Sequence, residues 1–220
     1  MRRLNFAASK RLMAGGLLWA SLVQIFVVNN AIVLPRATSQ NLIAKIISAL
    51  GITQCGYVGG SRFCSPLHDA ADGAWIAGGI CLVAGTLLNA VLLPADRPRN
   101  LAFGSLAVGG AGLTASGLTP YNLHPVAHLV AAGTCFFFGG VGIIVLGATL
   151  RQAGRPYWGT LGIVCGVTSL VFTLVTAIKP DPGIQGLVER AAAWPSVMWI
   201  IGSGIVIALT VWRGRRTGAD

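Results

Sequence analysis

The chain has 220 residues, of which 54% are hydrophobic and only 10% are charged, and its formal net charge is +10. A soluble domain carries about 25% charged residues, so this composition excludes a water-exposed surface over most of the molecule. The basic residues form no run interleaved with aromatic side chains, which argues against a nucleic-acid-binding surface. Nothing in the sequence indicates a cofactor.

Six apolar runs are long enough to cross a bilayer. The first covers residues 12–34 and lies between a basic N-terminal segment and the dipeptide Pro35-Arg36. It exceeds the apolar core of about 7–15 residues found in a secretory signal, so we expect an uncleaved span. The other runs cover residues 74–93, 101–118, 125–150, 158–178 and 194–212. The sequence predicts an all-α, polytopic membrane bundle that forms a single transmembrane domain over residues 1–220.

The basic residues indicate the orientation of these spans. Eleven of the 16 lysines and arginines lie before the first span, after the last span, or in the loops 94–100 and 151–157. The remaining five lie in the longer segments on the opposite side. Because basic residues accumulate in cytoplasmic loops, we expect both termini to be cytoplasmic. Within the first span, Gln24, Asn29 and Asn30 are polar and should face other helices or a cavity rather than lipid.

The segment 35–73 is the longest polar stretch and is predicted to lie outside. Residues 41–50 carry a helical apolar stripe, which predicts a short amphipathic helix on the bilayer surface or capping the bundle. Cys55 and Cys64 lie nine positions apart in the same segment. Outside the cytoplasm such a pair is expected to form a structural disulfide.

The predicted orientation gathers most titratable residues on the outer face. All three histidines and four of the six acidic residues lie there. His68, Asp69 and Asp72 open the second span. The two acids can simply stabilise the start of a helix. Alternatively, burial at the membrane edge would favour a neutral carboxyl group, and a protonated Asp72 could act as a general acid, with Asp69 beside it.

Two histidines open the fourth span with a spacing that suits chelation. His124 and His128 share a helix face, and His68, Asp72 or Glu189 could supply a third metal ligand, although two histidines at this spacing are common without a metal. Before the sixth span, Glu189 and Arg190 point in different directions and each needs a partner. A structural bridge of Glu189 to a histidine, or of Arg190 to Asp72, is one alternative. A catalytic role for Glu189 and His128, with Arg190 binding a substrate anion, is the other.

Three motifs carry a resemblance to a known family. They are Cys55-Gly56 with Cys64-Ser65-Pro66-Leu67-His68-Asp69, Gly117-Leu118-Thr119-Pro120 ahead of the two histidines, and Gly186-Leu187-Val188-Glu189-Arg190 leading to Trp199. Together they resemble the DUF998 family of bacterial six-span membrane proteins. The resemblance implies a multi-pass protein of a bacterial cell membrane. One departure is Ala71-Asp72-Gly73, where the family is expected to have an asparagine after the His-Asp pair.

The sequence alone is compatible with three hypotheses about function. The first is a bundle that binds or modifies a lipid or isoprenoid at its outer mouth. Its catalytic residues would be Asp72, Asp69, Glu189 and His128, and its substrate-binding residues would be His68, His124, Tyr121, Asn122 and Arg190. An acid-initiated isoprenoid cyclase and a metal-dependent lipid hydrolase are its enzymatic forms. The second reading is a non-catalytic structural or partner protein. The third is a transporter, for which Gln24 and Asn89 are the best candidates near the bilayer centre.

Overall fold

The computed structural model describes residues 6–38, 41–58, 61–178 and 181–216. Of the charged residues counted above, Arg2, Arg3, Lys179 and Asp220 lie outside the described residues. Within these ranges, six helical segments are long and apolar enough to cross a membrane. They cover Ala8–Arg36, His68–Leu92, Arg97–Leu118, Pro125–Gln152, Pro156–Ala177 and Gln185–Arg216. The all-α polytopic architecture predicted from the sequence is confirmed.

The first span is a succession of different helix types. It comprises α1 (Phe6–Ala20), the short α2 (Val23–Phe26), the π-helix η1 (Val27–Val33) and the 3-10 turn η2 (Leu34–Arg36). The other spans are α3 (His68–Asn89) with the short η4 (Ala90–Leu92), α4 (Arg97–Leu118), α5 (Pro125–Gln152), α6 (Pro156–Ala177) and α7 (Gln185–Arg216). The observed helices extend the predicted spans chiefly at their polar ends, where hydropathy falls but backbone hydrogen bonding continues.

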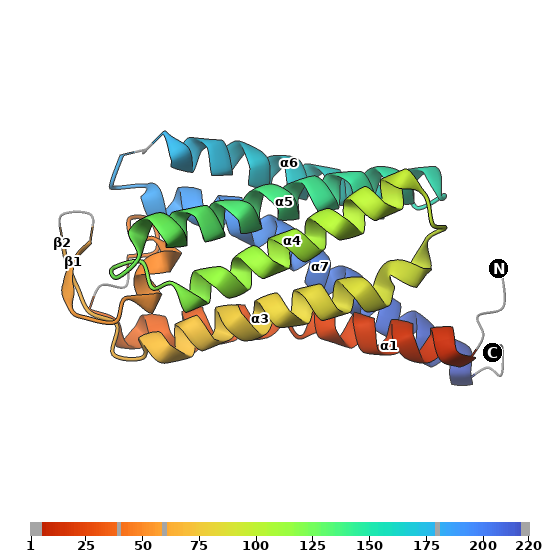
Figure 1. The fold of residues 1–220 in the computed structure, drawn as a ribbon, viewed down its shortest axis with the longest axis horizontal. Helices are drawn as coiled ribbons and strands as arrows, with labels where there is room; N and C mark the ends of the chain where they lie inside the picture. Colours follow the sequence, from red (N-terminus) through yellow and green to blue (C-terminus); the bar gives the residue numbers. More distant parts are fainter. Residues whose placement is uncertain (1–5, 39–40, 59–60, 179–180, 217–220) are drawn as a thin grey trace.

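The helices form a closed ring around the bundle axis. Going round it, α1 packs on α3, α3 on α4, α4 on α5, α5 on α6, α6 on α7, and α7 returns to α1. The described chain begins and ends at the same end of the bundle (Figure 1). We call this the terminal end. The opposite end, formed by residues 37–38, 41–58, 61–67, 119–124 and 181–184, is the loop end.

Glycines allow these helices to approach closely. A Cβ added at Gly147 would meet the Gly159 carbonyl oxygen, and a Cβ added at Gly159 would meet the Gly147 carbonyl oxygen. Gly140 and Gly166 are related in the same way. Lipid tails are as apolar as leucine, so helices in a bilayer gain little from burying large apolar side chains and associate through close backbone packing instead. These two pairs join α5 to α6.

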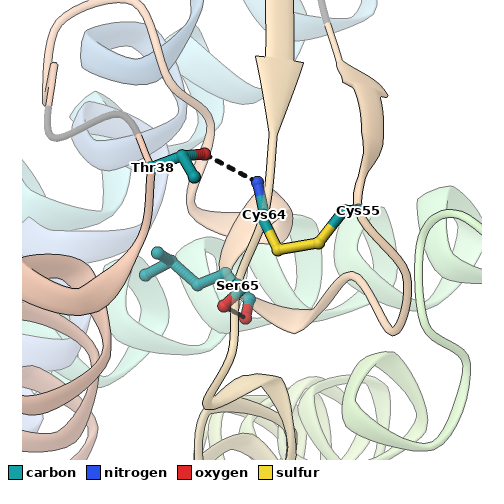
Figure 2. Close-up of a disulfide and its surroundings, with 5 residues drawn as sticks. Thr38, Cys55, Cys64 and Ser65 are labelled. Atoms are coloured by element: carbon teal, nitrogen blue, oxygen red, sulfur yellow. Dashed lines mark hydrogen bonds between the residues drawn. A yellow bond between two sulfur atoms is a disulfide. The ribbon is translucent and has the colours of Figure 1, made fainter.

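The segment before α3 contains a β-hairpin that the sequence analysis did not predict. Strands β1 (Gly56–Val58) and β2 (Ser61–Phe63) pair antiparallel, with Tyr57 opposite Arg62. The predicted Cys55–Cys64 disulfide joins the residues that flank this pairing (Figure 2). The Cys64 amide donates to Thr38 Oγ1 at 2.8 Å, and the Ser65 hydroxyl donates to the Leu50 carbonyl at 2.6 Å. These two bonds attach the end of the hairpin to Thr38, just after the first span, and to η3.

The helix expected over residues 41–50 differs in the structure. The 3-10 helix η3 covers Ile47–Gly51, and a turn precedes it. Asn41 Oδ1 accepts hydrogen bonds from the Ile43 and Ala44 amides, which favours this turn over a helix. Part of the apolar stripe is nevertheless used, because Leu50 is buried, together with Ala49, against Val33, Phe63 and Trp75, whereas Leu42 and Ile43 are exposed. The segment caps the bundle, which was one of the two predicted placements.

Candidate functional site

Arg190 fixes the segment 42–45 across the loop end of the bundle. Its Nη1 atom donates to the carbonyl oxygens of Leu42 at 2.8 Å, Lys45 at 2.6 Å and Gly186 at 2.9 Å. The Leu187 amide donates to the Ile43 carbonyl at 2.9 Å. Carbonyl groups that a helix would have used internally are thus bound by α7. This explains why the apolar stripe of residues 41–50 does not form a regular helix.

Glu189 lies beside Arg190 and holds the next part of the same segment. Its carboxyl group accepts from the Ile47 amide and, at 2.6 Å, from the Ser48 hydroxyl. Ser48 Oγ in turn lies 3.0 Å from His128 Nε2 on α5. The other ring nitrogen, Nδ1, lies 2.8 Å from the Thr119 carbonyl oxygen and 3.1 Å from that of Ser116. Three elements that are distant in sequence therefore meet through Ser48.

The hydrogen atoms of this chain can be counted. Carbonyl oxygens only accept, so His128 Nδ1 carries a proton. The two contacts of Ser48 Oγ, with Glu189 and with Nε2, each require a hydrogen, and the hydroxyl supplies only one. A further proton is therefore shared between Glu189 and His128. If this proton is on His128, Glu189 is a carboxylate and His128 is an imidazolium. If it is on Glu189, the acid and the imidazole are both neutral. The net charge of the trio is zero in both cases.

Beneath this polar layer lies a cavity of about 90 Å³ inside the helix ring. A single water molecule needs only about 10–15 Å³ on the same scale. Ser48, His128, Glu189 and Arg190 line it at the loop end, and Leu82 and Ile200 are among its deeper lining residues. From Arg190 to Ile200, α7 advances roughly 15 Å along the bundle. Most of the remaining wall is apolar and includes Leu22, Ile25, Trp75, Leu113, Phe136 and Trp194.

Three buried polar atoms in the cavity wall have no hydrogen-bond partner among the described residues. They are Asn29 Oδ1, Arg190 Nε and Ser196 Oγ. The residues are only 3%, 4% and 6% exposed, respectively. Buried polar groups in proteins nearly always have partners, so such atoms around a cavity indicate water or a ligand there.

The two spans that carry these atoms are irregular at this level. Asn29 and Asn30 lie in the π-helix η1, and their side-chain amides donate to the Ile25 and Phe26 carbonyls at 2.9 and 3.0 Å. On α7, Pro195 lacks the amide that would bond the carbonyl of residue 191. Short π-helical segments inside α-helices are frequent at functional sites. The irregular parts of the first and last spans thus both border the cavity.

The sequence-predicted residues are distributed unequally around this site. Glu189, His128 and Arg190 line the cavity. The Tyr121 ring packs edge-on against the His128 ring, with centroids 5.7 Å apart. Asn122 exchanges two hydrogen bonds of 3.0 Å with Thr53, which ties the turn between α4 and α5 to the loop segment.

The residues at the start of α3 lie away from the cavity lining. Asp72 is 8% exposed and faces Gly51 of η3, with its Oδ1 atom unpaired among the described residues. Asp69 is exposed, and its Oδ1 lies 3.1 Å from His68 Nδ1. His124 is exposed at the N-cap of α5. Within the described part of the chain, no three His, Cys, Asp or Glu side chains are grouped as metal ligands. Both ring nitrogens of His128 are already engaged.

Sequence reasoning missed Ser48 and Ser196. Serine is common in loops and in membrane helices, so neither position stands out in the sequence. The dipeptide Trp194-Pro195 was the available signal for Ser196, because a proline inside an apolar run marks an interrupted helix. For Ser48, no local signal exists. Its importance arises from Glu189 and His128, which are both far away in the sequence.

The comparisons with known proteins agree with the architecture. The family model described as a protein of unknown function, DUF998, matches residues 13–206. The chain belongs to the DUF998 family. No curated protein and no solved structure matches it. The DUF998 match spans every wall of the cavity, from Leu22 in the first span to Ile200 in the last.

Proposed function

We propose that this DUF998 protein binds a lipid or isoprenoid in the central cavity, with the apolar chain between the helices and the polar end beneath the loop segment. The supporting observation is the combination of an elongated apolar wall with unpartnered polar atoms. Asn29 Oδ1, Arg190 Nε and Ser196 Oγ offer both acceptors and donors. A compact polar solute would leave the apolar wall unused, and a plain hydrocarbon would leave the polar atoms unpaired.

The proposal includes the orientation argued from the basic residues. The loop end, with the hairpin and the disulfide, faces the outside of a bacterial cell membrane, and the terminal end faces the cytoplasm. The excess of arginine and lysine at the terminal end supports this orientation. The polar end of the cavity is then at the outer leaflet.

The experiment is native mass spectrometry of the protein purified in a mild detergent, comparing two leucine variants on the same helix. Gly139 lines the cavity, whereas Gly133 does not, and a Cβ at either position meets no atom within 4 Å. We expect a bound amphiphile on the wild type and on Gly133→Leu, and its loss from Gly139→Leu. An adduct retained at full occupancy by Gly139→Leu would refute binding in the cavity.

A second candidate function is proton-initiated chemistry on an isoprenoid. It is favoured by the shared proton of Glu189, Ser48 and His128, which lies at the wall of an apolar cavity. A neutral Glu189 would give its proton to an alkene carbon, forming a C–H bond and leaving a carbocation on the adjacent carbon. Loss of a proton from a neighbouring carbon to the carboxylate would restore the acid. Trp75 and Trp194 could stabilise the cation.

This second function separates from simple binding by one substitution. Glu189→Gln keeps an acceptor for Ser48 and removes the acid. We expect it to retain the bound amphiphile and to abolish any conversion of an added isoprenoid, followed by mass spectrometry of the extracted lipid. Conversion at the wild-type rate in Glu189→Gln would exclude Glu189 as the acid. Asp72, the acid favoured by the sequence, is the next variant to test.

A further inference from the structure

The charge of Arg190 is not balanced by a nearby carboxylate. Among the described residues, no acidic oxygen lies within 4.0 Å of its guanidinium nitrogens. Its bonded partners are three neutral carbonyl groups, and its carbon Cζ lies 5.6 Å from the centre of the Trp194 ring. Arginine remains charged in proteins. The residue is 4% exposed, so bulk solvent screens this charge only weakly.

Glu189, the neighbouring acid, forms no ion pair with Arg190 within 4.0 Å among the described residues. Its two oxygens are already bound by the Ile47 amide and the Ser48 hydroxyl. The hydrogen count given above makes the trio of Glu189, Ser48 and His128 neutral as a whole. The site therefore carries one net positive charge, centred on Arg190, beside an apolar cavity.

From this balance we infer that the ligand of the cavity is an amphiphile with an anionic end, a phosphate or a carboxylate, that pairs with Arg190. The inference rests on the proposed binding function and specifies its ligand. The free Nε–H of Arg190 is the donor that this anion would use. Buried charges in proteins are paired, and planar guanidinium groups suit phosphate and carboxylate oxygens. Ser196 Oγ and Asn29 Oδ1, in the same wall, could hydrogen-bond hydroxyl groups of the ligand.

The test compares probes that differ only in the charge of their end group. Dodecyl phosphate and laurate are anionic, dodecanol is neutral, and inorganic phosphate is an anion without a chain. Affinity is measured by tryptophan fluorescence, since Trp75 and Trp194 line the cavity, and by the melting temperature in a nonionic detergent. We expect the anionic amphiphiles to bind about tenfold more tightly than dodecanol. This ratio of dissociation constants corresponds to the free energy of one charge-assisted hydrogen bond.

Two variants assign the preference to a residue. Arg190→Gln should reduce the preference for the anionic amphiphiles to less than about twofold, because about 1 kcal/mol of charge-assisted bonding or more is removed. Arg36→Gln is the matched control, since Arg36 is exposed at the same end and also donates to a backbone carbonyl, that of Ile32. It should keep the wild-type preference. If Arg190→Gln does not fold, the comparison of probes on the wild type still decides the charge of the ligand.

The outcomes separate the inference from the function on which it rests. Equal binding of laurate, dodecyl phosphate and dodecanol would overturn the anionic ligand and leave the cavity proposal standing. Binding of none of the amphiphiles would overturn the cavity proposal itself. If inorganic phosphate bound as tightly as dodecyl phosphate, the alkyl chain would add nothing to the affinity, and the inference that the ligand is an amphiphile would be overturned. An anionic preference that persists in folded Arg190→Gln would overturn the assignment to Arg190.

Discussion

The role of Ser48 can be tested by removing one oxygen atom. Ser48→Ala deletes the hydroxyl that connects Glu189 at 2.6 Å with His128 at 3.0 Å. A hydrogen bond to a charged group contributes about 1.5–3 kcal/mol and one between neutral groups about 0.5–1.5 kcal/mol. Because the two contacts are either both neutral or both charged, together they make a loss of about 1–3 or about 3–6 kcal/mol. In a chain of this size, the whole range corresponds to a fall in melting temperature of roughly 2–24 °C.

Ser196→Ala is the matched control for this experiment. Ser196 is 6% exposed and Ser48 is 8% exposed, so both substitutions remove a buried hydroxyl. Ser196 Oγ, however, has no partner among the described residues. We expect its removal from the ligand-free protein to change stability by less than about 0.5 kcal/mol, or to raise it slightly, because an unpaired polar group is deleted.

The assay is thermal unfolding of both variants after exchange into ligand-free detergent, followed by circular dichroism. The difference between the two variants is the informative quantity, because the detergent affects both equally. Equal melting temperatures for Ser48→Ala and Ser196→Ala would refute the reasoning. The connection of η3 to α5 and α7 through Ser48 would then contribute nothing to stability.

Three further predictions concern other parts of the loop end and the topology. Replacing both hairpin cysteines by serine should cost about 2–3 kcal/mol through loop entropy, read as a lower melting temperature that reductant no longer changes. Gly186→Ala should destabilise the protein by more than about 1 kcal/mol, because its Cβ would strike the Leu42 and Lys45 carbonyls, whereas Gly73→Ala, which meets no atom within 4 Å, should not. A cysteine introduced at Tyr57, 81% exposed, should react with a membrane-impermeant thiol reagent on intact cells, and one at Tyr157, 92% exposed, only after permeabilisation. The reverse labelling pattern would contradict the proposed orientation.

The architecture could be predicted because it follows from composition along single segments. The scarcity of charge and the six apolar runs determine where the chain can cross a bilayer. The polar residues of the first span were also informative, since Asn29 has few options in an apolar run and lies at the cavity. Such predictions need only the properties of neighbouring residues and the known thickness of the membrane.

The candidate site could be predicted only in part, because its key contacts join distant segments. Glu189, His128 and Arg190 stand out as ionisable residues near span ends, and all three line the cavity. Asp72 has the same sequence features but faces η3 instead. Which side of a helix faces the interior depends on the packing of the other spans. The segment 41–50 shows the same limit, because its apolar spacing predicts a helix and its carbonyls are bound by a residue almost 150 positions away.

The closed order of the helix ring has a consequence for biosynthesis. The wall of the cavity needs both the first span and the sixth, and the loop segment is held by Glu189 and Arg190, which are made after the first five spans. Until α7 enters the membrane, Asn29 and Ser48 have been synthesised without the partners that surround them in the finished protein. The cavity is therefore complete only when α7 closes the ring. A protein whose last span has failed to insert would have no cavity in which a ligand could be held, so ligand occupancy would report complete insertion.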